Sequence, residues 1–306
     1  EEVSRGLGDV YKRQNYNNKR NNFFAFWLTD WMKDFDSLAQ KKWFCWNFYL
    51  TNNHIKHETK DLPYCTIRYQ DWKNYCLKGL ENLSIKEFNV QSITNLKKYY
   101  EIKLENGEEI FAKKIYDSRT PKLENEKVKQ HFFGYLIETK QMINSNSVTL
   151  MDFRVEQKMG LHFMYCLPID ENRMLVESTV FSSEIQEDAW YQKQILEYIE
   201  TKLNLSEYKI VDEEKGALPM YDIENKSSEN YINIGSRGGA TKISTGYAFS
   251  FFLKNIMLNF ENINKAHHSY FDKWMDKVFV NYLQNNSGTE KIFVNMAYSL
   301  NGNEFA

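Results

Sequence analysis

The stretch GLHFMYCLPIDENRMLVESTVFS, residues 160–182, predicts two strands joined by a turn. Its two halves, 161–169 and 174–181, are rich in aromatic, aliphatic and β-branched residues, which favour strands. Pro168 and the polar run at 170–172 supply the turn between them. The stretch therefore predicts a β-hairpin whose second strand carries a single carboxylate, Glu177.

Glu177 is the candidate catalytic residue of this hairpin. Its neighbours Leu175, Val176 and Val180 are apolar, and burial beside such residues disfavours the charged carboxylate and raises its pKa. A carboxyl group in this state can act as a general acid. Strand side chains alternate, however, so Glu177 and Ser178 can also mark the face that contacts water, and the hairpin alone favours this second interpretation.

The composition limits the class of protein. A chain of 306 residues can form one large domain or two smaller ones. Its net charge of -2 gives no basic field for nucleic acid. The four cysteines lack the CxxC spacing of a zinc site. We therefore expect no nucleic-acid partner, no metal and a reducing, cytosolic setting. Aromatic residues make up 16% of the chain, which indicates a large core or a site for an apolar ligand.

Neither end of the sequence resembles a natural terminus. The chain has no initiator Met, and residues 1–14 lack a structural pattern and resemble translated adaptor sequence, so we expect a non-native scar there. The tail stops without a closing element, which suggests C-terminal truncation. The sequence shows neither a secretory signal nor an apolar run long enough to cross a membrane.

Strands dominate the rest of the chain. We expect strands at 84–90, 99–104, 109–112, 114–119, 132–138, 148–155, 208–218 and 231–234, and helices at 69–83, 187–203 and 264–283. Asn106-Gly107 between two alternating runs is a strong hairpin signal. The short connections predict a largely antiparallel sheet with one covered face.

Two groups of aromatic residues are more typical of a core than of a binding site. Four tryptophans lie close together in the sequence: Trp27, Trp31, Trp43 and Trp46. The helix expected at 264–283 carries an apolar stripe with Tyr270 and Trp274. A substrate wall is the alternative for the tryptophans.

The second informative stretch is YINIGSRGGATKISTGYAFSFF, residues 231–252. A short apolar strand runs into several glycines and then into a helix. Glycines at such a turn let the backbone approach a phosphate or a flat cofactor, and the N–H groups at a helix start favour anions. The pattern predicts a cofactor-binding turn, with a plain tight turn as the alternative.

Eight motifs in a fixed order give the chain a resemblance to a known family. They are FAFW (24–27), YDSR (116–119), FFGYLIET (132–139), LMDFR (150–154), FMYCLP (163–168), LVEST (175–179), KGALPM (215–220) and GSRGGATKISTGYAF (235–249). On these motifs, residues 24 to about 297 resemble the flavin-dependent lycopene cyclase family, which closes the end rings of carotenoids, and in particular its bacterial form.

The resemblance implies a mixed α/β architecture, a Rossmann-like flavoprotein fold that binds FAD and NAD(P) and contains an inserted antiparallel-sheet substrate domain. Nothing in the chain matches the GxGxxG opening of that fold, so we expect the first β-α-β unit to be missing. The expected parts are the rest of the FAD-binding domain at 15–120, the substrate domain at 121–230, and the FAD-domain return with C-terminal helices at 231–306.

The family's essential acid falls on Glu177, within LVEST. Many relatives have a second acid where this chain has Ser178, so a relay of two carboxylates on this strand is not expected. The resemblance assigns flavin contacts to Asp117, Arg119, Gly235, Arg237, Gly238, Gly239, Thr245, Gly246 and Tyr247. The family often has His-Pro before Thr-Gly-Tyr, whereas this chain has Lys242-Ile243-Ser244 before Thr245-Gly246-Tyr247, which changes the fine contacts of that loop. The candidate substrate wall consists of Trp27, Trp43, Phe163 and Tyr165.

The implied activity is the acid-catalysed, redox-neutral cyclisation of lycopene, or a related acyclic carotenoid, to β-ionone rings. Reduced FAD would stabilise the cation, and NAD(P)H would serve only as reductant. Because the substrate dissolves in membranes, we expect a cytoplasmic protein peripherally associated with the membrane, with Trp27, Trp31 and Trp43 at the wall or the interface.

Two alternatives stay open. The first is a flavin-dependent monooxygenase or polyprenyl reductase on the same scaffold, in which Glu177 would be structural. The second is an inactive fragment that binds an apolar ligand. Because the pyrophosphate turn is absent, we expect this chain to bind FAD weakly or not at all and to be weakly active or inactive.

Overall fold

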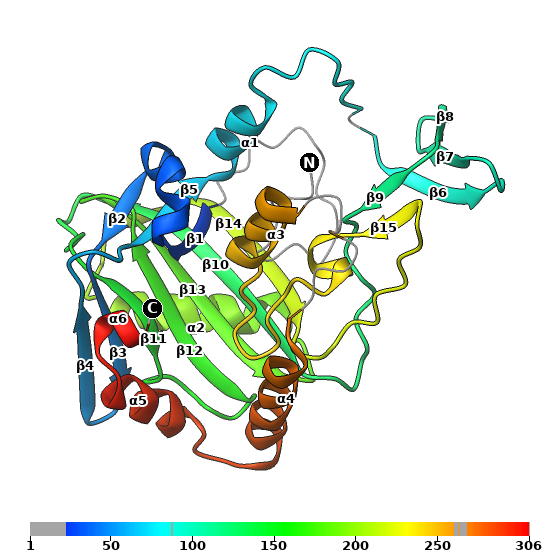
Figure 1. Cartoon of the computed structure of the whole chain (residues 1–306). Helices are drawn as coiled ribbons and strands as arrows, with labels where there is room; N and C mark the ends of the chain where they lie inside the picture. Colours follow the sequence, from blue (N-terminus) through cyan, green and yellow to red (C-terminus); the bar gives the residue numbers. More distant parts are fainter. Residues whose placement is uncertain (1–22, 87, 260–262, 264–267, 306) are drawn as a thin grey trace.

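The computed structural model describes residues 23–86, 88–259, 263 and 268–305, and its main feature is a seven-stranded sheet (Figure 1). In pairing order the strands are β14 (Tyr208–Pro219), β10 (Lys129–Thr139), β13 (Arg173–Ser182), β12 (Leu161–Pro168), β11 (Val148–Asp152), β3 (Cys45–Leu50) and β4 (Asn53–Glu58). All neighbours are antiparallel except β11 and β3. The predicted hairpin thus forms as β12 and β13, near the middle of the sheet. The predicted scar at 1–14 lies outside the described residues.

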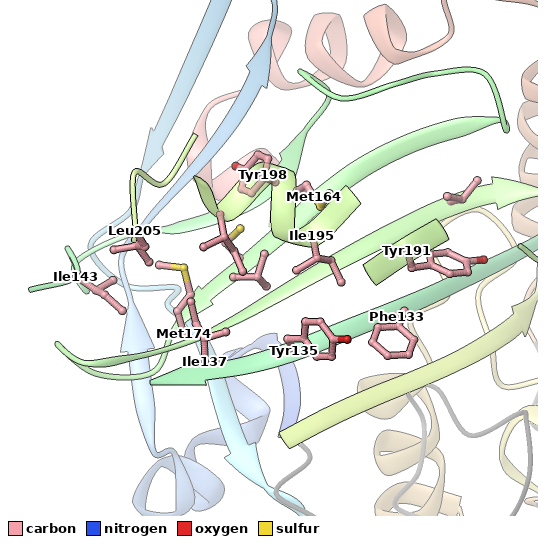
Figure 2. Packing of buried hydrophobic residues seen from close by; sticks show 14 residues of the cluster. Phe133, Tyr135, Ile137, Ile143, Met164, Met174, Tyr191, Ile195, Tyr198 and Leu205 are labelled. Carbon is pink, nitrogen blue, oxygen red and sulfur yellow. The ribbon is translucent and has the colours of Figure 1, made fainter. Parts of the chain in front are cut away.

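Helix α2 (Asp188–Thr201) covers one face of this sheet (Figures 1 and 2). Strand alternation sends Val176 and Val180 of β13 to this face, where they join Ile195 and Tyr198 of α2 in one buried cluster. Ile195 is completely buried. We call this the helix face of the sheet.

The opposite face, which we call the site face, receives the alternate residues of β13. Leu175 packs in a cluster with Trp43 and Trp46, and Phe181 packs in another with Val280. The elements that contribute to this layer are β1 (Phe23–Trp27), β2 (Lys41–Trp43), β5 (Tyr64–Arg68), α4 (Tyr270–Asn285), α5 (Glu290–Ser299) and α6 (Gly302–Phe305). Both faces of the central strands are therefore covered, and the prediction of a single covered face is wrong.

A separate two-stranded parallel sheet pairs β9 (Ile115–Asp117) with β15 (Tyr231–Asn233). Because parallel strands end at the same edge, Asp117 lies beside the turn η3 (Gly235–Gly238) that follows β15. The chain then continues into α3 (Phe249–Asn259), which Figure 1 shows between this pair and the three-stranded sheet formed by β1, β5 and β2.

The remaining described elements lie between residues 30 and 112. They are η2 (Asp30–Leu38), α1 (Tyr69–Leu77) and a three-stranded meander of β6 (Val90–Asn95), β7 (Tyr100–Leu104) and β8 (Glu109–Ala112). The hairpin signal at Asn106-Gly107 is confirmed, and Gly107 has a φ of +85°. The strand predicted at 84–90 is wrong, because the described residues between 84 and 89 have no regular secondary structure and β6 begins only at Val90.

The two aromatic groups differ in their burial. Trp43 and Trp46 are 1% and 0% exposed, so their prediction as core is confirmed. On α4, Tyr270 is 86% and Trp274 50% exposed, so the prediction of a buried stripe is wrong. The part of that predicted helix at 264–267 lies outside the described residues. No helix within the described ranges is long and apolar enough to span a membrane.

Candidate active site

Glu177 lies on the site face of β13, with an exposed fraction of 9%. It is opposite Gly134 of β10 on one side and Tyr165 of β12 on the other. The hydroxyl of Thr179, two residues along the same face, donates a hydrogen bond to Glu177 Oε1 at 2.5 Å. The interpretation of Glu177 as a marker of a wet face is therefore wrong, because this face of β13 is covered.

A second carboxyl group, Glu214 of β14, lies next to Glu177 across Gly134. Gly134 pairs with both glutamates. A methyl group at Gly134 would lie 3.3 Å from Glu214 Cγ and 3.4 Å from Glu177 Cβ. The missing side chain therefore leaves the space in which the two carboxyl groups meet.

The two carboxyl groups shift each other's titration. Burial, followed by the charge of Glu214 and a hydrogen bond with it, raises the pKa of Glu177. Burial and the charge of Asp212 raise the pKa of Glu214. Glu214 is only half-buried, so water screens its charge more than that of Glu177. The proton that the pair shares therefore belongs mainly on Glu177.

Three tyrosine hydroxyls meet beside this pair. Tyr64 of β5 is hydrogen-bonded to Tyr165 at 2.8 Å and to Tyr247 at 3.1 Å, oxygen to oxygen. Burial raises the pKa of Tyr247 to about 12 and raises those of Tyr64 and Tyr165 well above the ordinary value, so all three are neutral. The Trp27 ring lies 4.7 Å from that of Tyr64 and 5.8 Å from that of Tyr247, centroid to centroid. Aromatic side chains thus lie next to the acid, beginning with Tyr165, its neighbour on β12.

Several of the predicted cofactor residues gather at the ends of β9 and β15. Arg119 donates hydrogen bonds to Asp117 from Nε at 2.9 Å and from Nη2 at 2.8 Å, and Arg237 Nε lies 3.1 Å from Asp117 Oδ2. Burial acts to raise the pKa of Asp117, but hydrogen bonds from Arg119 and Tyr231 outweigh it and lower the pKa. Both arginine side chains keep about a third of their surface exposed. They can attract an anionic group while remaining anchored.

The glycine-rich turn fits the edge of a flat cofactor. Gly235 has a φ of +58° and no atom within 4 Å of a would-be Cβ, so its backbone is open to approach. Gly246 has a φ of +74°, and a Cβ there would overlap Gln130 Oε1. That oxygen is buried without a hydrogen-bond partner in the structure. Open glycine backbone, two nearby guanidinium groups and an unsatisfied amide oxygen fit a flavin dinucleotide.

The other predicted residues take up several positions. Gly238 and Gly239 belong to the same turn as Gly235, and Thr245 precedes Gly246. Phe163 lies on the site face of β12, two residues from Tyr165, and packs against Phe181. Trp43 lies behind Tyr64 at 6.4 Å between ring centroids and has no exposed surface for a membrane interface, so that part of its prediction is wrong.

Sequence reasoning missed Glu214, Gly134 and Tyr64. It expected no second acid on the strand of Glu177, and Ser178 indeed points to the helix face, where its hydroxyl is 2.8 Å from His162 Nε2. The second acid comes from β14 instead. Glu214 was inside a predicted strand and just before the KGALPM motif, but no sequence pattern gives the register between strands. Among the described residues, no three His, Cys, Asp or Glu side chains form a group that could hold a metal ion.

The fold is similar to that of several flavoenzyme structures. A geranylgeranyl bacteriochlorophyll reductase-like protein from Thermoplasma acidophilum matches with a TM-score of 0.63 and 10% identity, over 99% of this chain and 84% of that one. HpxO from Klebsiella pneumoniae, complexed with FAD, gives 0.55 and 8%, over 90% and 82%. The halogenase PltM in complex with FAD gives 0.54 and 9%, over 82% and 60%. The protein therefore has a mixed α/β, Rossmann-like flavoprotein fold, as predicted.

The family model for lycopene cyclase protein matches residues 17–275. The chain accordingly belongs to the lycopene cyclase family, which connects it with carotenoid biosynthesis and confirms the resemblance seen in the motifs. No curated protein matches the chain.

Proposed function

We propose that the protein catalyses the acid-driven, redox-neutral cyclisation of lycopene ψ-ends to β-ionone rings, with Glu177 as acid and base. The observation that carries this proposal is the position of Glu177, a buried carboxyl group beside a second acid and inside a ring of aromatic side chains that includes Tyr247 of the glycine-rich turn. Family membership supports the choice of substrate.

The first step is proton transfer from Glu177 to a terminal alkene carbon. An alkene is a weak base, so the acid must be protonated near neutral pH, desolvated and close to carbon. Burial and the charge of Glu214 provide the protonated state. A new C–H bond forms as the O–H bond breaks, and a tertiary carbocation results.

The second step closes the ring and restores the acid. A neighbouring double bond attacks the cation, and the ring cation loses a proton to the Glu177 carboxylate, so the reaction is balanced without any redox change. The faces of Trp27, Tyr64 and Tyr165 can stabilise the positive charge through their quadrupoles. Because the three tyrosines are neutral, none offers a phenolate that would trap the cation.

FAD is the cofactor that these residues would hold. Arg119 and Arg237 would attract its phosphates, Asp117 would orient the two arginines, and the backbone at Gly235 and the turn before Tyr247 would receive the flavin. Reduced, anionic flavin would supply negative charge near the cation. NAD(P)H would be needed only to reduce it.

A membrane surface is the proposed source of the hydrocarbon substrate. Trp43 is buried, and exposed apolar residues lie instead on α4, where Phe271, Trp274, Val278 and Tyr282 are each about half exposed or more. Their spacing places them along one side of the helix. Aromatic rings of this kind favour the boundary between water and lipid.

A redox enzyme on the same scaffold is the second candidate, because one similar fold is that of a protein described as reductase-like. Replacement of Glu177 distinguishes a cyclase from a redox enzyme. Glu177→Gln keeps the shape of the side chain but cannot donate the proton. A cyclase should then keep its flavin and lose ring formation, whereas a redox enzyme should retain most of its turnover.

Because this chain is expected to be weakly active or inactive, the test is expression in a lycopene-accumulating host, with pigment analysis, of a homologue that carries the GxGxxG opening and of its variants at the positions that match Glu177 and Glu213. Glu213→Gln is the matched control, because Glu213 is an exposed acid on the same strand as Glu214. Normal β-ring formation by the Glu177→Gln variant would contradict the proposal that Glu177 is the acid. The visible spectrum of the purified chain tests the separate expectation that it binds FAD weakly.

A further inference from the structure

We propose that Glu214 is the positioning residue of the acid: it carries the negative charge of the carboxyl pair, keeps the shared proton on Glu177 and connects that proton with solvent. This inference rests on the proposed function, because it assigns the control of an acid whose use is itself proposed. It concerns a residue outside the sequence motif that carries Glu177.

The sheet register brings the two acids together and gives them unequal access to water. Glu177 and Glu214 belong to the strands on either side of β10, and both are opposite Gly134 on the site face. Glu177 is 9% exposed, whereas Glu214 is half-buried. Ionisation is therefore less costly at Glu214, because Glu214 is the more exposed of the two acids.

The groups around the pair leave its charge unneutralised. Thr179 donates to Glu177, the neutral phenols Tyr165 and Tyr247 face it from β12 and from the glycine-rich turn, and Asp212 adds a negative charge on β14. Within the described part of the chain, neither glutamate forms an ion pair with lysine or arginine. Two like charges in one enclosed site disfavour double ionisation, so the pair retains one proton.

The difference in exposure between the two acids determines the direction of proton transfer, from water to Glu214 and then to Glu177. When Glu177 has lost its proton, Glu214 can take one from water and pass it to Glu177 in the space that Gly134 leaves between them. Each transfer forms one O–H bond as another breaks, and the pair returns to a protonated Glu177 beside an ionised Glu214. Gly134 maintains this path because any larger side chain would enter the space between them.

Infrared spectroscopy of the whole chain can follow the protonated carboxyl group directly. In Glu214→Gln the neighbouring charge is gone, and the amide can donate a hydrogen bond to the Glu177 carboxylate. We expect the carboxyl band of Glu177 to titrate about 1 to 2 pH units lower than in the wild type. Glu214→Ala should also lower it, and Glu213→Gln should leave it unchanged. An unchanged Glu177 titration in both Glu214 variants would overturn the inference.

The dependence of ring formation on pH provides a second readout that a purely structural role would not produce. With lycopene in vesicles and reduced FAD, Glu214→Gln should lose activity about tenfold for each pH unit above the lowered pKa and regain it at lower pH. A loss of equal size at every pH would contradict the inference. If Glu177→Gln still forms rings, the proposed function is wrong, and the infrared titration alone decides the role of Glu214.

Discussion

The helix face and the site face of the seven-stranded sheet bury polar groups in different ways. On the helix face, both nitrogens of His162 have partners at 2.8 Å, the carbonyl of Glu156 and the hydroxyl of Ser178. Burial lowers the pKa of His162 to about 4, so the ring is neutral at physiological pH. On the site face, two acids lie together with raised pKa values.

This difference distinguishes a group that stabilises the fold from a pair of acids that we propose for a reaction. A neutral, fully hydrogen-bonded histidine satisfies the buried backbone and hydroxyl groups around it at little electrostatic cost. A pair of buried acids costs stability whenever it ionises, and such shifted groups are typical of functional sites. The same β13 strand supplies both faces, with Ser178 on one and Glu177 on the other.

The largest expected effect on stability comes from the helix face. Ile195→Ala removes a completely buried side chain of α2 and should lower the free energy of unfolding by about 2–5 kcal/mol. Leu196→Ala, at a position 40% exposed, should change it by less than about 1 kcal/mol. Denaturant unfolding measures both. Equal effects would mean that α2 does not pack on the sheet as described.

The second prediction concerns the stability of the site face as a function of pH. A glutamate whose pKa is higher in the folded than in the unfolded state contributes to stability. This contribution is fully present at a pH below the pKa of the unfolded state, and it is lost as pH rises through the pKa of the folded state. Glu177→Gln does not titrate there. As pH rises above the ordinary glutamate range, the free energy of unfolding of the variant should therefore increase relative to that of the wild type, by about 1–3 kcal/mol in alkaline solution.

Thermal or denaturant unfolding of wild type and Glu177→Gln at several pH values checks this sign. Glu213→Gln controls for the loss of one surface charge. A variant that loses stability relative to wild type with rising pH would show that the carboxyl group of Glu177 has no raised pKa.

A third change, Gly134→Ala, acts on the space between the two acids. The added methyl would lie 3.3 Å from Glu214 Cγ and from Leu175 Cδ1, so neighbouring atoms must shift. We expect a loss of about 1–2 kcal/mol in the free energy of unfolding and a weaker coupling of the two carboxyl titrations. Infrared titration measures the coupling. Full coupling in this variant would mean that the glutamates do not meet across Gly134.

The smallest effect is expected outside both faces, on the exposed side of α4. Trp274→Ser removes an aromatic ring that is 50% exposed and should weaken binding to lipid vesicles severalfold while leaving the unfolding free energy nearly unchanged. Co-sedimentation with vesicles measures this binding. Lys254→Ser on α3, an exposed position without the ring, is the control. Vesicle binding that is insensitive to Trp274 would exclude α4 as the interface.

Sequence reasoning was strongest where the signal is local. The hairpin of β12 and β13, the Asn106-Gly107 turn and the helix α2 follow from alternation, turn chemistry and helical spacing, which act over a few residues. The apolar stripe of α4 predicts burial but is exposed in the structure, because a helical apolar pattern does not specify what packs against it. Site residues that lie within one predicted strand, such as Glu177, could be identified from the same local patterns as the hairpin.

The sequence by itself determined the central hairpin, the acid within it, the glycine-rich turn and, through ordered motifs, the family. Only the tertiary structure decided that Glu214 completes a pair with Glu177 and that Tyr64 joins Tyr165 to Tyr247. The physical reason is that local patterns fix which face of a strand a side chain occupies. Register, which brings residues 37 positions apart to the same glycine, is set by the packing of the whole sheet.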